Sequence, residues 1–427
     1  MPLVKLAEET IVPSDEERSD YFRPRVLKVI VEYGLLEDPA KWCGFVETFA
    51  EKAQASRHYD KARDYWEEAT RLASYSKNLE KEKAFKERLT ASFVEEARSM
   101  RADGASAMLL SDRYTKAIEA CRRHGGKRAL IDELHQEMNA IHQRLPAEMK
   151  RIETSVDVTD LVKAARAAVE DCSLEDAIAR IAVMAIPPRK TSLRAEVEEA
   201  SKKFVFMNLL SAVSYNDKGR VVARTAPVIA SDEETRDAGT LAQMLIQCVQ
   251  HQAMVGISRI EAARETLSRR CPSDTPLFDD LVTMNPFVPQ GREDIFVRGL
   301  KAGLRGDHLV CAHLLIPQIE NSVRVNMERS GLLVTRLTDE QTQKEHDLNT
   351  LLYKDETEKV FGEDLVFSMR ALLVEEVGAN FRNKLSHGLL GSDQFHGGIV
   401  NYLWALTIRL CWLGKLLVKR SDAPSHA

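Results

Sequence analysis

The sequence predicts an all-α protein, with an N-terminal irregular helical array followed by a C-terminal helical bundle. Residues that break helices are scarce, with 14 Pro and 20 Gly among 427 residues. Apolar residues recur at helical spacing through most of the chain. A hydrophobic content of 44% and a charged content of 29% are typical of a globular chain that buries a core. The length predicts two or three domains.

The first 22 residues are expected to form a polar lead-in. They lack the apolar core of a signal peptide. The seven cysteines are scattered, and no two of them form a C-x-x-C pair. This usage favours a reducing compartment and argues against a disulfide framework or a Cys-based zinc site. We therefore expect a cytoplasmic location.

Residues 23–270 are expected to form a helical N-terminal region. A turn at Asn216–Gly219 and an extended segment at 220–224 interrupt it, so the region forms one unit or two subdomains with a break near 215–234. Similar helix openings occur at Tyr59, Tyr114 and Leu174, at offsets of 55 and 60 residues. These offsets fit an irregular array, or a coincidence in an Ala-rich chain, and no repeat of fixed period.

A Pro-rich linker is predicted at 271–291, followed by a second domain at 292–420 and a disordered tail at 421–427. In this domain we expect a helix at 294–304 and a long helix at 308–330, with Asp307 as its N-cap. The charged segment 335–360 is predicted to be a surface insertion. The last helix, 399–419, is apolar, but Arg409 near its middle favours a buried helix over a membrane span.

The strongest candidates for catalytic residues lie between Asn380 and Gly388, in the sequence NFRNKLSHG. We expect one amphipathic helix from Asp364 through this motif, with a buried stripe that continues to Leu385. Arg382 and His387 suit metal-independent RNA cleavage, in which a 2'-hydroxyl attacks the adjacent phosphate. A histidine titrates in the range that the proton transfers need, and an arginine matches the phosphoryl oxygens.

The spacing of the two residues sets a geometric limit. Five positions on an ideal helix separate Arg382 and His387 by about 140°. Either Gly388 ends the helix at His387, or two copies of the chain each supply part of one site.

Several polar residues are candidates for a supporting role. Glu376, Asn380, Asn383 and His387 are spaced 4, 3 and 4, which predicts a polar stripe that is either a solvated face or the floor of a groove. Glu320 and Arg324 on the helix 308–330 form either a structural ion pair or a support for the site from the facing helix. Lys384 belongs to the motif itself.

The pattern Arg-Asn-x-x-x-His-Gly resembles the HEPN superfamily (higher eukaryotes and prokaryotes nucleotide-binding). The similarity extends over about residues 290–420 and includes GLRGD at 303–307 and LLIPQIE at 314–320. Ser386 stands where that family often has Ala. The resemblance implies a four-helix arrangement, a homodimer, no cofactor, and in many members metal-independent ribonuclease activity in a toxin or antiviral defence setting.

Carried onto this chain, the resemblance implies that Arg382 holds the scissile phosphate and that His387 is a general acid or base. Asn383 would orient the phosphate or the histidine. The N-terminal region would contact a trigger or a partner protein. The alternative is a non-catalytic domain that dimerises or binds a nucleotide or RNA.

The charge of the chain limits how RNA could be bound. The net charge is −5, and residues 292–420 hold 17 Lys and Arg against 17 Asp and Glu. A broad, charge-driven interaction with nucleic acid or membrane is therefore not expected. A local site for a selected RNA, such as a folded loop, fits better. His135 and His142 share a helix face, but no nearby carboxylate or Cys completes a metal site, so no metal is expected.

Overall fold

The structure is a computed structural model that describes residues 19–34, 38–150, 155–216, 219–272 and 275–421. Residues 422–427 of the predicted tail and residues 1–18 of the predicted lead-in lie outside this range, whereas helices include Ser421 and residues 19–22. The prediction of an all-α protein is confirmed, because the described elements are helices except for two two-stranded sheets, β1–β2 and β3–β4. No helix among the described residues is long and apolar enough to cross a membrane.

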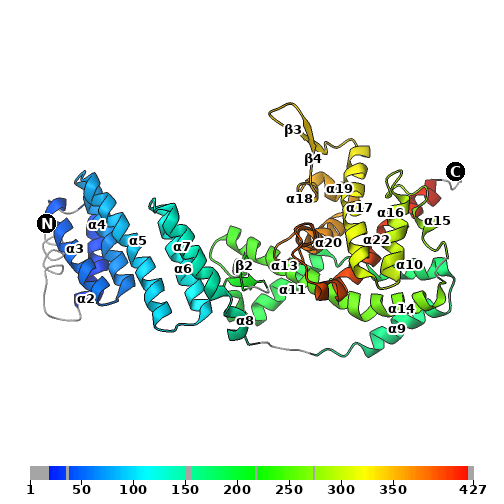
Figure 1. The fold of residues 1–427 in the computed structure, drawn as a ribbon, viewed down its shortest axis with the longest axis horizontal. Helices are drawn as coiled ribbons and strands as arrows, with labels where there is room; N and C mark the ends of the chain where they lie inside the picture. Colours follow the sequence, from blue (N-terminus) through cyan, green and yellow to red (C-terminus); the bar gives the residue numbers. More distant parts are fainter. Residues whose placement is uncertain (1–18, 35–37, 151–154, 217–218, 273–274, 422–427) are drawn as a thin grey trace. The chain divides into compact units, whose positions relative to one another are not determined.

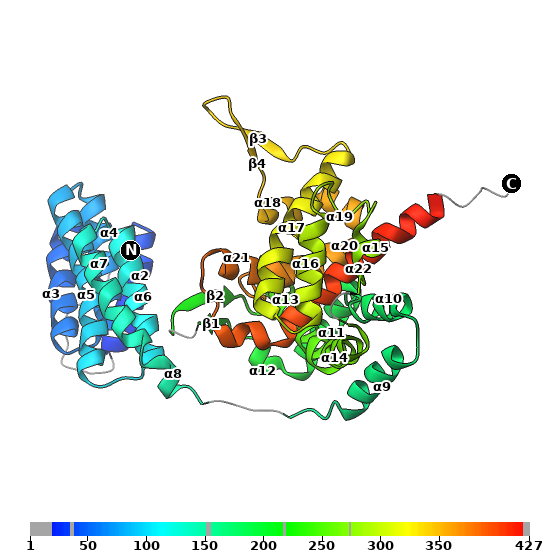
Figure 2. The same ribbon diagram turned by 45° about the vertical axis from the view of Figure 1, so that its right-hand side comes forward.

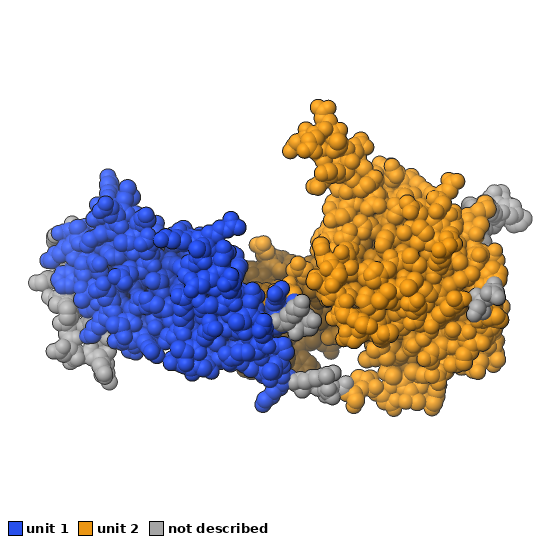
Figure 3. All heavy atoms as spheres, in the orientation of Figure 1, with its two compact units in different colours: residues 1–152, 215–220 blue, residues 153–214, 221–427 orange. Residues whose placement is uncertain are grey.

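The chain divides into two compact units (Figure 3). Unit 1 comprises residues 1–152 and 215–220, and unit 2 comprises residues 153–214 and 221–427. This grouping differs from the predicted domains, because helices between 159 and 270 pack with the C-terminal part of the chain. The strand at 221–225 confirms the predicted extended segment.

Unit 1 is built from helices in which each packs mainly on its neighbours in sequence (Figures 1 and 2). Alanines and aromatic side chains fill the contacts, with Ala62, Tyr65, Trp66 and Ala69 all buried. Tyr59 opens α4 as expected, but Tyr114 lies inside α6, so the proposed similarity of helix openings fails there. The helices are α2 (Ser19–Glu32), α3 (Pro39–Ala55), α4 (Tyr59–Tyr75), α5 (Leu79–Ala102), α6 (Ala107–Arg123), α7 (Arg128–His142) and α8 (Leu145–Glu148).

The first half of unit 2 supplies helices that surround the last helix of the chain. Its elements are α9 (Thr159–Glu170), α10 (Leu174–Met184), α11 (Lys190–Lys203), α12 (Val205–Asn208), β1 (Ala212–Tyr215), β2 (Val221–Thr225), α13 (Glu233–Val255), the π-helical turn η1 (Gly256–Ile260), α14 (Glu261–Arg270) and α15 (Asp279–Val282). Tyr215, at the end of β1, belongs to unit 1.

The second half of unit 2 carries the motif. Its elements are α16 (Glu293–Leu304), α17 (His308–Arg329), β3 (Thr335–Leu337), β4 (Gln343–Glu345), α18 (Leu348–Leu352), α19 (Asp355–Phe361), α20 (Glu363–Leu373), α21 (Phe381–Ser386), the 3-10 turn η2 (Ser392–His396) and α22 (Gly398–Ser421). The sequence predicted α16 and α17 closely, and the Asp307 carboxylate accepts a hydrogen bond from Val310 N as an N-cap.

Helix α22 runs through the core of unit 2. Tyr402 and Trp404 are fully buried, and the Trp404 indole donates to the Leu300 carbonyl at 2.9 Å. A glycine is needed opposite this ring, because a Cβ on Gly303 would lie 2.2 Å from it. Arg409 donates to the Ala182 carbonyl at 3.2 Å, so the charge inside the apolar helix has a protein partner.

The segment predicted as a Pro-rich linker, 271–291, is part of the core of unit 2. Phe278, Val282 and Phe287 are buried. The Asn285 side chain donates to the Cys411 carbonyl at 2.7 Å, which fixes the segment against α22. Apolar side chains between the prolines explain this packing, because their burial outweighs the tendency of Pro to mark a linker.

The predicted surface insertion, 335–360, is only partly peripheral. The hairpin β3–β4 projects away from the rest of unit 2 (Figures 1 and 2). Helix α18 instead joins the core, with Leu348, Leu351 and Leu352 buried. As a result, α18 lies beside α17 and α20, which brings it next to the motif.

Candidate functional site

The predicted continuous motif helix is wrong, because the chain breaks between α20 and α21. Helix α20 ends at Leu373, and the Ala379 amide then donates to the Ala371 carbonyl at 2.9 Å. The chain thus turns back onto the end of α20. This turn needs a glycine at position 378, where a Cβ would lie 2.2 Å from the Ala371 oxygen. The apolar spacing that suggested one helix continues across the turn.

The two ends of α21 are set by unusual backbone conformations. Asn380 precedes the helix in the left-handed region, with φ of 50°, a conformation that Asn tolerates better than most residues. Gly388 follows it with φ of 63°. The helix therefore ends at Ser386 with His387 as its C-cap, which agrees with the expectation that Gly388 stops it.

The predicted polar stripe is not a helix face. Glu376 lies in the turn before α21, and Asn380 lies outside the helix at its N-cap. Asn380 and Asn383 still meet, because the Asn383 amide donates to Asn380 Oδ1 at 2.7 Å. The stripe is thus replaced by a folded turn in which only part of the expected set makes contact.

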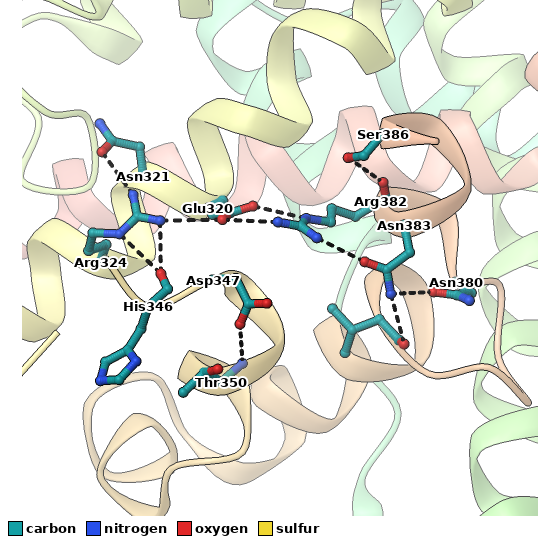
Figure 4. A network of polar contacts seen from close by, with 11 residues as sticks. Glu320, Asn321, Arg324, His346, Asp347, Thr350, Asn380, Arg382, Asn383 and Ser386 are labelled. Atoms are coloured by element: carbon teal, nitrogen blue, oxygen red, sulfur yellow. Dashed lines mark hydrogen bonds and ion pairs between the residues drawn. The ribbon is translucent and has the colours of Figure 1, made fainter. Parts of the chain in front are cut away.

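Arg382 binds Glu320 on the facing helix α17 (Figure 4). Its Nε donates to Glu320 Oε2 at 3.0 Å, and its Nη2 donates to Oε1 at 3.2 Å. Nη1 donates to Asn383 Oδ1 at 2.9 Å. The side chains of Arg382 and Glu320 are 20% and 16% exposed, so most of the ion pair is shielded from water. Arg382 is held in one orientation by these three bonds.

Glu320 also accepts from Arg324, and so holds two guanidinium groups. Arg324 Nη2 lies 3.3 Å from Glu320 Oε1 and 3.0 Å from the His346 carbonyl oxygen. The predicted pair of Glu320 and Arg324 therefore exists, and it is connected to the motif. The two interpretations offered from the sequence, a structural ion pair and a support for the motif, both apply to the same set of contacts.

The segment after β4 contributes residues that the sequence did not single out. Asp347 caps α18 by accepting from Thr350 N at 2.9 Å (Figure 4). The Thr350 hydrogen bonds lower the pKa of Asp347, and the nearby Arg382 lowers it further. These residues were assigned to a surface insertion, and only the D-x-x-T capping spacing could have indicated their position.

His387 is exposed at the end of α21. Its amide donates to the Asn383 carbonyl at 3.1 Å, and in the part of the chain that the structure describes no hydrogen bond or ion pair involves its side chain. His387 lies outside α21 as its C-cap, with φ of −97°, and five positions on an ideal helix correspond to about 140°. Among the described residues no hydrogen bond or ion pair joins the side chains of Arg382 and His387.

Lys384 lies between these two residues and is partly buried. Burial lowers its pKa below the ordinary value, because desolvation disfavours the charged form. Phe381, at the start of α21, packs edge-on against Phe395 with ring centres 6.0 Å apart. This contact ties α21 to η2, while His396 turns toward His308, with ring centres 6.2 Å apart.

A pocket of about 410 Å³ adjoins this network at Asn383, which is one of its lining residues. It is formed by β2, α18, the turn between α20 and α21, and α21. The residues around it include Arg224, Asn349, Tyr353, Glu375, Glu376 and Asn383.

The described residues contain no cluster of three or more His, Cys, Asp or Glu side chains that could hold a metal ion. Comparison of the chain with protein-family models, with curated proteins and with solved structures gave no match in any of the three.

Proposed function

We propose that this protein is a metal-independent endoribonuclease whose active site is assembled from two copies of the chain. The proposal rests on the motif residues and on one observation above all. Arg382 is fixed by Glu320 and Asn383 within five positions of an exposed histidine that ends the same short helix.

The fixed arginine keeps donors for a ligand. A guanidinium has five N–H groups, and the described bonds use three of them. The remaining two belong to the two terminal nitrogens, one on each, and each can donate to a phosphoryl oxygen. Glu320 thus acts as a positioning residue that orients Arg382 and leaves this fork available.

The proposed reaction needs only these groups and the RNA. The 2'-oxygen attacks the adjacent phosphorus, the bond from phosphorus to the 5'-oxygen breaks, and the products are a 2',3'-cyclic phosphate and a free 5'-hydroxyl. Arg382 stabilises the negative charge on phosphorus. His387 accepts the proton of the 2'-hydroxyl or donates one to the leaving 5'-oxygen.

Two copies resolve the angular separation of the two residues. In a symmetric dimer with α21 near the axis, Arg382 of one copy faces His387 of the other. Water accepts or supplies the proton that His387 does not transfer, so each site needs one Arg382 and one His387. The resemblance to HEPN proteins supports this arrangement and implies a cytoplasmic toxin or antiviral defence setting, with unit 1 as the surface for a partner protein.

A second candidate is a non-catalytic domain that dimerises or binds RNA. It is favoured by the ion pair itself, because a guanidinium that is largely buried against a carboxylate has a structural role without any ligand. In that case His387 would be dispensable, and only Arg382 would matter for folding.

The first test is cleavage of RNA in the presence of EDTA. We expect wild-type protein to cut a mixture of structured RNAs and to leave 2',3'-cyclic phosphate ends. His387→Ala and Arg382→Lys are each expected to lower the rate by at least about 100-fold, as is usual for removal of a general acid or a charge-stabilising group. Arg382→Lys retains the charge but loses the fork.

Matched controls distinguish the two candidate functions. His58→Ala and Arg298→Lys change exposed residues outside the network and should cut RNA like the wild type. Cleavage that survives His387→Ala with the same product ends would refute the proposal. Folded wild-type protein that binds RNA without cutting it favours the binding domain.

A further inference from the structure

The pocket beside Asn383 presents an excess of hydrogen-bond acceptors. The Asn349 side-chain oxygen is buried and has no partner within the described structure. Glu376 is exposed at the pocket, and no described residue binds its carboxylate. A buried acceptor without a donor is costly, so the site is better satisfied when a ligand supplies N–H groups.

The neighbouring carboxylate is held in place by protein groups and leaves one oxygen over. Glu375 Oε1 accepts from Arg370 Nη2 at 2.6 Å and from the Tyr353 hydroxyl at 2.7 Å. The described bonds to this side chain all end on Oε1, so Oε2 faces no described donor. Arg370 also lies over the Tyr353 ring, 4.1 Å from its centre, which fixes the ring.

The pocket also has groups that suit an aromatic, anionic ligand. Tyr353 is 57% exposed and offers a fixed ring at the edge of the pocket, of the kind on which an unstacked base lies. Arg224 adds a cation that makes no described ion pair. The combination of a ring, a cation and carboxylates matches a nucleotide that bears several N–H donors.

Among the RNA bases, guanine fits this set of acceptors best. Its Watson–Crick edge presents N1–H beside the N2 amino group, which together match one carboxylate with two parallel hydrogen bonds. Adenine and cytosine present an amino group beside an acceptor nitrogen, which a carboxylate repels. Uracil presents a single N–H between two carbonyl oxygens.

We propose that this pocket binds a guanine base of the RNA, with Glu376 as the residue that selects it, Asn349 and Glu375 as further acceptors, and Tyr353 as its stacking surface. Asn383 forms a wall of the pocket and also binds Arg382, so a base in the pocket places its phosphate beside the proposed catalytic arginine. This inference rests on the proposed function, and it adds sequence selectivity to it.

The test measures binding and therefore does not depend on cleavage. RNA pentamers that differ only in the central base are made with a 2'-deoxy central nucleotide, which removes the attacking hydroxyl at that linkage. Their affinity for wild-type protein is measured by fluorescence anisotropy with guanine, inosine, adenine or uracil at the centre. We expect guanine to bind most tightly, inosine less tightly because it lacks the N2 amino group, and adenine about tenfold to 100-fold more weakly than guanine.

Substitutions connect this selectivity to the pocket. Glu376→Gln should reduce the preference for guanine over adenine to within about threefold, and Glu376→Asp should restore part of it. Glu356→Gln, an exposed carboxylate on α19, should leave it unchanged. Acetyl-arginine amide serves as a competitor that carries the N–H donors of a peptide arginine. It should not displace the RNA.

The outcomes separate the two proposals. Guanine-selective binding without cleavage of ordinary RNA supports the pocket and refutes the nuclease. Cleavage together with equal affinity for guanine and adenine refutes the pocket alone. Failure to bind any pentamer, or displacement by acetyl-arginine amide, also overturns the pocket proposal.

Discussion

At the scale of single residues, Glu320 joins the two parts of the candidate site. It accepts from Arg382 across 62 positions of sequence and from Arg324 one turn along its own helix. The sequence could suggest the second contact, because residues four apart on a helix are neighbours. For the first, the sequence offered only a general support from the facing helix, because the specific pairing with Arg382 depends on how the chain brings α21 to α17.

Glu320→Gln tests the strength of this junction. The amide keeps the shape but removes the charge that binds two guanidinium groups, so the free energy of unfolding should fall by about 2 kcal/mol. Urea unfolding measures this change. Asp294→Asn is the control, because its ion pair with Arg298 is more than 70% exposed on both sides and should contribute under about 0.5 kcal/mol. Equal effects of the two substitutions would contradict the assigned role of Glu320.

His308 gives unit 2 a sensitivity to acid. Burial lowers its pKa below the ordinary value of 6.5, and Arg264 and His396 act in the same direction, while Glu261 and Asn401 oppose them. The unfolded chain therefore binds a proton that the folded chain does not. The contribution of neutral His308 to the free energy of unfolding is fully present above about pH 6.5. It is lost as the pH falls toward the pKa of His308 in the folded state, by at most about 1.4 kcal/mol per pH unit.

His308→Gln should remove this contribution, which urea unfolding at pH 7.5 and pH 5.5 can measure. We expect the difference in unfolding free energy between the two pH values to be smaller than in the wild type. Cys311→Ala is the control, because burial raises the pKa of this thiol and keeps it uncharged at both pH values. Its loss should therefore lower the free energy of unfolding by the same amount at pH 7.5 and at pH 5.5. An unchanged pH dependence in His308→Gln would show that His308 is not the group responsible.

At the scale of elements, the turn between α20 and α21 determines the site. It places Asn380 in a left-handed conformation before α21 and puts Val374 O within 3.4 Å of the Asn383 amide. The turn also forms one side of the pocket through Glu375 and Glu376. A continuous helix would supply neither arrangement.

Gly378→Ala should disturb this turn. The added Cβ would lie 2.2 Å from the Ala371 carbonyl oxygen, which backbone movement must relieve, at a cost of about 1–3 kcal/mol. We expect a lower unfolding free energy and slower RNA cleavage. Gly397→Ala is the matched control, since its Cβ would meet nothing within 4 Å. A Gly378→Ala protein with wild-type stability and activity would contradict the close approach.

The sequence was most informative where local chemistry decides the structure. Asp307 marked the start of α17, and the turn signal at Asn216 preceded β2. The predictions from the sequence were wrong where tertiary contacts determine the backbone path. The apolar spacing across Leu373, Val377 and Phe381 continues through the break, since a turn that folds back can bury the same side chains as a helix. The motif residues were named from the sequence, and so were Glu320 and Arg324 as candidate supports on α17, but Asp347 and Thr350 at the start of α18 were not.

At the scale of the whole molecule, the nearly balanced charge of the C-terminal part is consistent with a local site and not with a broad basic surface. Arg382 is fixed and largely enclosed, whereas His387 is exposed at the C-cap of α21. The proposed reaction uses a second copy of the chain to complete each site, so Arg382 and His387 are proposed to act in trans.

Mixing two inactive variants tests this claim most directly. Arg382→Lys and His387→Ala are incubated together under conditions that exchange subunits, and RNA cleavage is compared with each variant alone. Random pairing makes about half of the dimers mixed, and each mixed dimer holds one intact site of two, so we expect recovery of about a quarter of the wild-type activity. A mixture that is no more active than the separate variants, although exchange is shown to occur, would contradict it.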